Sequence, residues 1–149
     1  MVVGGRVGVA RIVGECASDA VAAPRYRLHH IQIAAPAGSE AQARAFFVDV
    51  LGMSEVSKPP RLAARGGIWL DFGRTQLHVG IETPFRPAEK AHPAFEVDDL
   101  EAVRRRLTAR GIETWEDEEF PGRRRFYTRD PFGNRLEFLS SPLPGQPGH

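Results

Sequence analysis

Four side chains that can bind a metal ion recur at matching positions in two halves of this chain. His30 opens one predicted strand and His92 opens another 62 positions later, whereas His78 and Glu137 lie 59 positions apart, each a few residues after a Phe-Gly turn. Imidazole nitrogens and carboxylate oxygens are suitable ligands for Zn, Ni, Mn, Co or Fe(II). A duplicated unit that repeats its ligand positions predicts one shared metal site at the interface between the copies.

The first copy has the pattern of a strand, a helix and three further strands. Alternation over residues 26–34 predicts a strand with Ile31 and Ile33 on one face and His30 and Gln32 on the other. Ser39 is the expected N-cap of a helix that ends at Gly52. The amphipathic stripe of that helix comprises Ala43, Phe46, Phe47, Val50 and Leu51. The remaining strands are predicted near residues 53–56, 68–72 and 75–82.

The second copy repeats this order. A strand over residues 92–97 is followed by a helix capped by Asp98 or Asp99, with Glu101 at capping-box spacing from Asp98, and Gly111 ends this helix. Its apolar stripe is Leu100, Val103 and Leu107. Strands are predicted near 113–115, 124–128 and 134–139, with a type I turn at 130–133. In both copies the candidate ligands lie on the sheet face opposite the helix-packing residues. Two half-barrels that face each other would therefore bring these ligands together in a cup.

Composition limits the class of protein. A chain of 149 residues with 42% hydrophobic and 26% charged residues fits one globular domain, expected at 25–141 with modules at 26–82 and 92–140. A net charge of +1 gives no electrostatic footprint for nucleic acid, and no apolar run is long enough for a membrane span. The single Cys16 excludes an internal disulfide and favours a reducing, cytoplasmic setting. Residues 1–24 are predicted to be a flexible extension without a secretory signal, and 142–149 a disordered tail.

Four segments stand out together: Leu28-His-His-Ile-Gln-Ile33, Phe46-Phe-Val-Asp-Val-Leu-Gly-Met53, Lys90-Ala-His-Pro-Ala-Phe-Glu-Val97 and Asp130-Pro-Phe-Gly-Asn-Arg-Leu-Glu-Phe138. In this order and spacing they resemble the vicinal oxygen chelate superfamily, which contains glyoxalases, bleomycin-resistance proteins and extradiol dioxygenases. The resemblance implies an α+β fold of two βαβββ modules forming an open, cup-shaped mixed sheet that binds a divalent metal. It also implies a homodimer, sometimes formed by exchange of modules.

Carried over by position, the metal ligands are His30, His92 and Glu137, with His78 in the fourth position, and Glu137 is also the expected catalytic residue. Glyoxalase I enzymes commonly have a glutamate where His78 stands, so this departure bears on glyoxalase I activity and not on the metal site. The alternative interpretation of His30 is a half-buried strand histidine bonded to the backbone, and that of Glu137 an exposed carboxylate. His78 is either a fourth ligand or a hydrogen-bonding residue of the cup.

By strand alternation three further residues face the cup, and these are the predicted substrate contacts: Gln32, Gln76 and Arg135. Solvated positions near the rim are the other interpretation, above all for Arg135. The run Arg123–Arg125 is either solvated surface or a means of steering an anionic substrate into the cup.

The expected function is that of a metal-dependent glyoxalase-like enzyme, a lyase, isomerase or thiol transferase acting on a small oxygen-chelating substrate. One alternative is a metal-independent antibiotic-binding protein of the bleomycin-resistance type, although such binders generally lose the His and Glu set. The other is a single-domain Fe(II) dioxygenase, although those enzymes usually have twice as many modules.

Overall fold

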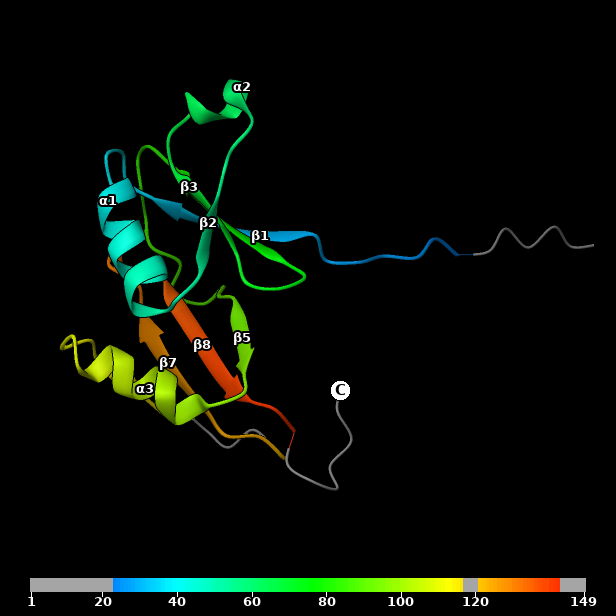
Figure 1. Ribbon diagram of the computed structural model, residues 1–149, viewed down its shortest axis with the longest axis vertical. Helices are drawn as coiled ribbons and strands as arrows, with labels where there is room; N and C mark the ends of the chain where they lie inside the picture. The colour runs from blue at the N-terminus through cyan, green and yellow to red at the C-terminus, as the bar shows by residue number, and fades with distance from the viewer. Residues whose placement is uncertain (1–22, 117–120, 143–149) are drawn as a thin grey trace, which may run out of the picture.

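The computed structural model describes residues 23–116 and 121–142 (Figure 1). Within them the chain forms two four-stranded sheets of identical topology, ordered β1-β4-β3-β2 and β5-β8-β7-β6. The strands are β1 (His30–Ala35), β2 (Ser54–Val56), β3 (Ile68–Asp71), β4 (Gln76–Ile81), β5 (Ala94–Val97), β6 (Thr114–Trp115), β7 (Arg125–Arg129) and β8 (Arg135–Ser140). In each sheet the first strand is parallel to the last and the other neighbours are antiparallel. The predicted α+β fold of two βαβββ modules is confirmed. Most of the predicted extension and tail lies outside the described residues.

The helix of the first module begins as expected but has a wider turn than the sequence pattern predicts. It consists of α1 (Glu40–Ala43) followed by a π-helical segment, η1 (Arg44–Val50). The amide of Leu51 bonds to the carbonyl of Phe46, five residues back, at 3.0 Å. The predicted apolar stripe is nonetheless buried, apart from the partly exposed Leu51. Ser39 precedes the helix, but its side chain makes no capping bond because its ψ angle of 3° is not the extended conformation of an N-cap.

The helix of the second module, α3 (Leu100–Thr108), is capped by Asp99. Its side chain accepts a hydrogen bond from the amide of Ala102 at 2.8 Å. The capping box expected between Asp98 and Glu101 therefore does not form, because Asp99 occupies the N-cap position. Gly52 and Gly111 follow the two module helices with φ angles of +78° and +69°, which confirms the predicted helix ends. A short helix absent from the predictions, α2 (Pro60–Ala63), lies between β2 and β3.

Alternation along the strands separates a helix-packing face from a concave face in both sheets. On the helix side one hydrophobic core runs through both modules, and Phe72 meets Phe95 across the junction with ring centroids 5.1 Å apart. In Figure 1 α1 and α3 lie on the same side of the molecule. The candidate site residues lie on the sheet faces that these two helices do not cover, and Leu62 of the short α2 lines the hollow over the first sheet.

The modules are also joined by a buried polar side chain in the β7–β8 hairpin. Asn134 is 1% exposed, and its Nδ2 donates to the carbonyl of Ala34 at 2.8 Å and to Asp130 Oδ2 at 2.7 Å. Its Oδ1 accepts from the amide of Ala88 at 3.0 Å. The amide of Gly133 donates to the carbonyl of Asp130, as in the predicted type I turn. This turn thus links the last strand of the second module to the first strand of the first. No helix in the described ranges is long and apolar enough to cross a membrane.

Candidate functional site

Three rings form a stack on the concave face of the first sheet. His78 lies between His30, with ring centroids 4.3 Å apart, and Trp69, with centroids 4.1 Å apart. The register explains the contact, because Trp69 lies directly opposite His78 and His30 pairs with Gln76, two residues before it. The sheet thus brings His30 and His78 together, as the sequence predicts.

His78 is buried, and its surroundings disfavour the protonated ring. Its side chain lies 3.1 Å, Nε2 to Oε1, from Gln76. Burial lowers the pKa of His78, and the positive charges of His30, His29 and Lys58 lower it further. A neutral imidazole is the form that can bind a metal, but this one also has a hydrogen-bonding partner. Both interpretations of His78, fourth ligand and cup-lining residue, are compatible with this environment.

A hollow of about 540 Å³ lies over this face, and the predicted substrate contacts Gln32 and Gln76 line it together with His30 and His78. His29 also lines the hollow, with its Nδ1 3.0 Å from that of His30. His29 precedes β1, which begins only at His30, so strand alternation does not determine where its side chain lies.

The second pair of candidate ligands meets on the concave face of the other sheet. His92 Nε2 lies 2.9 Å from Glu137 Oε2, with the two side chains 20% and 10% exposed. His92 precedes β5, whereas Glu137 is in the middle of β8 and its amide donates to the carbonyl of Pro93. The guanidinium of Arg125 donates to Glu137 Oε1 at 3.2 Å and so orients the carboxylate.

Both ring nitrogens of His92 face acceptors. Nδ1 lies 2.8 Å from the carbonyl oxygen of Lys90, which only accepts, so Nδ1 carries a proton and donates it. On a neutral ring the Nε2 lone pair would then face the lone pairs of Glu137. Such a contact is favourable only with a positive charge between the two atoms, either a proton on Nε2 or a metal ion. Metal-binding histidines typically donate their other N–H to a backbone carbonyl or a carboxylate, as His92 does.

The two pairs occupy equivalent positions in the two sheets. His30 and His78 are related across β1 and β4 as His92 and Glu137 are across β5 and β8. They do not merge within the chain: the described residues contain no group of three or more His, Cys, Asp or Glu side chains placed to hold one metal ion. The structure therefore gives two half-sites of two donors each.

The comparisons with known proteins agree with this duplicated architecture. The family model of the Glyoxalase/Bleomycin resistance protein/Dioxygenase superfamily matches residues 27–138. The chain belongs to this superfamily. Among solved structures, a glyoxalase family protein from Bacillus anthracis is 42% identical, with a TM-score of 0.77 over 80% of this chain and 98% of that one.

Two more distant solved structures share the fold. Lactoylglutathione lyase from Agrobacterium tumefaciens is 24% identical, with a TM-score of 0.63 over 83% of this chain and all of the other. TnmS3, an antibiotic binding protein from Streptomyces sp. CB03234, is 20% identical, with a TM-score of 0.63 over 80% of this chain and 98% of that one. No curated protein matches this sequence. The superfamily fold thus carries both catalysis and binding, and the site itself must decide between them.

The sequence interpretation missed some residues that shape this superfamily site. Trp69 and Tyr127 were not among the predicted site residues, yet Trp69 lies opposite His78 and Tyr127 lies opposite Glu137. Arg125 was expected to be either solvated surface or a residue that steers an anionic substrate, and in the structure it bonds to Glu137. Arg125 lies two residues before Tyr127 on β7, so alternation places both side chains on the same face of the sheet. The register between β7 and β8 was also needed to predict that Arg125 contacts Glu137.

Proposed function

We propose that this chain is a divalent-metal-dependent glyoxalase-like enzyme, of the lyase, isomerase or thiol-transferase class, acting on a small substrate with two neighbouring oxygens. The observation that carries the proposal is the contact between His92 and Glu137. Its two candidate ligand atoms, His92 Nε2 and Glu137 Oε2, lie 2.9 Å apart, and the other ring nitrogen, Nδ1, lies 2.8 Å from the carbonyl oxygen of Lys90.

The residues fit a metal ion in type and spacing. Donors bound at about 2.1 Å to one ion lie roughly 3.0–3.4 Å from each other, close to the separation of Nε2 and Oε2. His30 and His78 would supply two more nitrogens, and the set suits Zn, Ni, Mn, Co or Fe(II). A bound ion would polarise the oxygen pair of the substrate and stabilise negative charge that develops there.

The protein's own groups have distinct tasks under this proposal. Arg125 fixes Glu137 through Oε1 and leaves Oε2 directed at His92, so the carboxylate is oriented before substrate binds. We assign proton transfer to Glu137, because its carboxylate is buried on the concave face, where a substrate proton would be within reach. Gln32 and Gln76 would bind the uncharged part of the substrate from the first sheet.

We further propose that the metal site is completed by two chains. A catalytic metal needs three protein ligands or more, and each half-site offers two. In a two-fold symmetric dimer the His30 and His78 of one chain can face the His92 and Glu137 of its partner, and the symmetry repeats the arrangement. The duplicated sequence then gives two equivalent sites per dimer.

Metal analysis of reconstituted protein tests the first part. We expect one Zn, Ni, Mn, Co or Fe(II) per chain, a rise in melting temperature on loading, and loss of both in His92→Ala and Glu137→Gln. Glu96→Gln is the matched control, because Glu96 lies on the same face but pairs with Arg123. Wild-type protein that retains no metal would refute the proposal. Assays with methylglyoxal and glutathione, fosfomycin and a thiol, and catechol would then assign the reaction class.

Complementation between inactive chains tests the second part. One chain carries His30→Ala with His78→Ala and the other His92→Ala with Glu137→Ala, and the two are refolded together. If sites are shared between chains, each mixed dimer regains one intact metal site. If each site closes within one chain, the mixture binds no metal.

One observation favours a metal-independent binding protein instead. Every donor pair already has neighbours: Gln76 at His78, and Arg125 at Glu137. A proton on His92 would equally explain its contact with Glu137. The metal analysis decides here too, since a binding protein would show no metal-dependent stabilisation.

A further inference from the structure

Two arginines face each other on the concave surface of the second sheet. Arg129 and Arg135 are directly opposite cross-strand partners in β7 and β8, next to the hairpin turn. Side chains so paired lie on one face of a sheet with Cβ atoms about 5 Å apart, and like charges there repel. Such a pair calls for a compensating negative charge.

The described part of the protein supplies none. No carboxylate within it lies within ion-pair distance of Arg129 or Arg135. Arg129 donates to the carbonyl of Gly133 at 2.9 Å, and the buried Nε of Arg135 has no hydrogen-bond partner. Glu113 lines an open hollow of about 410 Å³ with Arg129 and Trp115 but forms no ion pair with either arginine.

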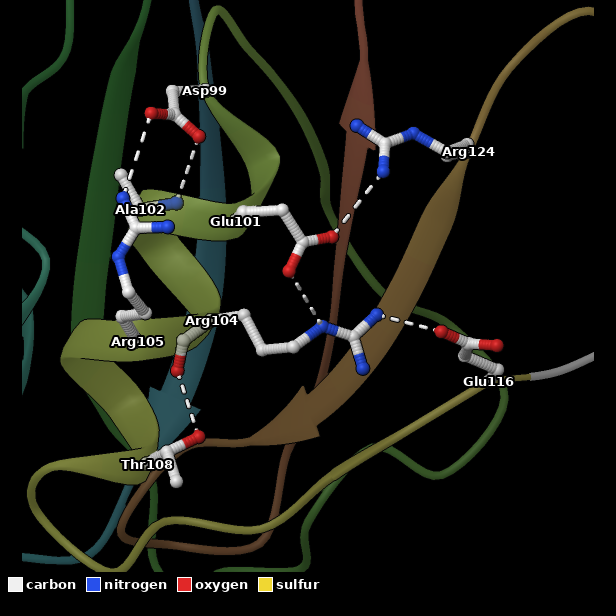
Figure 2. A network of polar contacts seen from close by, with 8 residues as sticks. All are labelled: Asp99, Glu101, Ala102, Arg104, Arg105, Thr108, Glu116 and Arg124. Carbon is white, nitrogen blue, oxygen red and sulfur yellow. Dashed lines mark hydrogen bonds and ion pairs between the residues drawn. The ribbon is translucent and has the colours of Figure 1, made fainter.

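The arginines on the helix side of the same module are arranged differently. Figure 2 shows the network of polar contacts around α3, in which each arginine has a carboxylate partner. The closest pairs are Arg104 with Glu116 at 2.8 Å, Arg124 with Glu101 at 3.4 Å and Arg105 with Asp99 at 3.7 Å. These three arginines are therefore paired with carboxylates, whereas Arg129 and Arg135 are not within the described residues.

The fold does not require this pair of arginines. In the first sheet the equivalent cross-strand partners are Asp71, which is negatively charged, and Gln76, which is uncharged. The second sheet thus places two cations where its duplicate has one anion and an amide. A ligand is the simplest cause for this difference, because the first sheet has the same topology without the pair.

Aromatic rings hold the two guanidinium groups in place. The Arg135 guanidinium lies 5.0 Å from the centroid of Tyr127, and the Arg129 guanidinium lies 5.6 Å from that of Trp115. Tyr127 itself is only 3% exposed and stacks with Trp115. Guanidinium groups resting on rings lose less freedom when they bind, and their planar forks match carboxylate or phosphonate oxygens.

We infer that Arg129 and Arg135 form an oxyanion clamp that binds a carboxylate or phosphonate group of the substrate. The assignment rests on the proposed function, since it names the substrate class of the same cup. Arg135 precedes Glu137 by two residues on one face of β8, a spacing of about 7 Å along a strand. The substrate would therefore carry its anionic group about that distance from the oxygens held near Glu137.

Calorimetric titration of metal-free full-length protein tests the clamp without relying on catalysis. Phenylphosphonate and benzoate are the probes, benzyl alcohol is the neutral control, and their relative affinities separate a phosphonate from a carboxylate preference. We expect both anions to bind and the alcohol not to, with at least a tenfold loss of affinity in Arg129→Gln and in Arg135→Gln. Arg110→Gln removes an exposed arginine on the helix side and should leave binding unchanged.

Each outcome bears on one hypothesis only. Equal affinity of wild type, Arg129→Gln and Arg135→Gln for both anions, or no anion binding at all, would overturn the clamp whatever the metal analysis finds. If His92→Ala no longer binds metal but still binds the anions, the clamp is supported independently of the metal site. If Arg135→Gln does not fold, Arg135→Lys keeps the charge but removes the fork, and a loss of phenylphosphonate affinity in it would carry the same conclusion.

Discussion

Removing the Asn134 side chain is predicted to loosen the junction between the modules. Asn134→Ala deletes the hydrogen bonds to Ala34, Ala88 and Asp130, which have lengths of 2.8, 3.0 and 2.7 Å. Asn134 is 1% exposed, so water cannot readily replace these contacts. The substitution leaves one buried carbonyl, one amide and one carboxylate oxygen without that partner.

The expected loss of stability follows from these groups. Each of the three hydrogen bonds contributes about 1–1.5 kcal/mol net, so we expect a loss of about 3–5 kcal/mol. That is a large part of the roughly 5–15 kcal/mol typical of a domain. In a domain of this size the melting temperature would fall by about 12–20 °C.

Urea titration and thermal melting measure the effect, with Thr128→Val as the matched control. Thr128 is also buried in the second module, but its hydroxyl makes one hydrogen bond, to the carbonyl of Glu113 at 2.7 Å, so a loss of about 1 kcal/mol is expected. If Asn134→Ala costs no more than this control, Asn134 does not join the modules as described.

Asn134→Asp provides a pH-dependent version of the same test. Burial raises the pKa of Asp130 above its ordinary value of 3.8, despite the hydrogen bonds that it accepts. A second carboxylate at this contact would raise it further, so the folded state would bind more protons than the unfolded state. The variant should therefore recover stability relative to wild type as the pH falls towards 3.8. If the stability lost in Asn134→Asp relative to wild type is the same at every pH, this reasoning is wrong.

Three further predictions concern the elements around the site. Asp99→Ala should cost about 1 kcal/mol in urea titration because it removes the α3 cap, whereas Asp98→Ala should not. Gly67→Ala should cost about 3 kcal/mol, since its φ is +75° and an added Cβ would lie 2.1 Å from a backbone oxygen, whereas Gly73→Ala meets nothing and should cost about 1 kcal/mol. The amide of Gly67 also lowers the pKa of Glu40, so the stability that Glu40 adds above pH 4.5 should be lost as the pH falls through the lowered pKa. Glu40→Gln should flatten that part of the urea-midpoint profile.

Periodicity in the sequence was sufficient to predict the order of the strands, their faces and the helix ends, but two strands start later than predicted: β1 begins at His30 rather than at residue 26, and β5 at Ala94 rather than at residue 92. Alternation alone placed Ile33 in the core and Gln32 on the concave side, because side chains alternate strictly along a strand. The turn at Asp130 followed from its residue types. The π-helical segment after Ala43 could not be predicted, because the buried stripe is compatible with either kind of helix. The short α2 could not be predicted either, because four residues give too short a pattern.

The arrangement of the candidate site was less accessible from the sequence. Strand alternation indicated that His30, His78, His92 and Glu137 belong on concave faces. It does not determine how the two sheets are oriented relative to each other. The structure resolves the set into two pairs. Likewise, the contact of Arg125 with Glu137 depends on the register between β7 and β8, which residue alternation does not fix.

Comparison of equivalent positions shows where the duplicated halves have diverged. His30 is matched by His92, but His78 is matched by Glu137, Gln76 by Arg135, and Asp71 by Arg129. The first sheet therefore presents stacked imidazole and indole rings, and the second a carboxylate among arginines. A fold that needs only alternation does not demand this difference, and under the proposed clamp it follows from what the two faces bind. A substrate held between them would place its anionic end on the second sheet and its neutral end on the first, which fixes its direction in the cup.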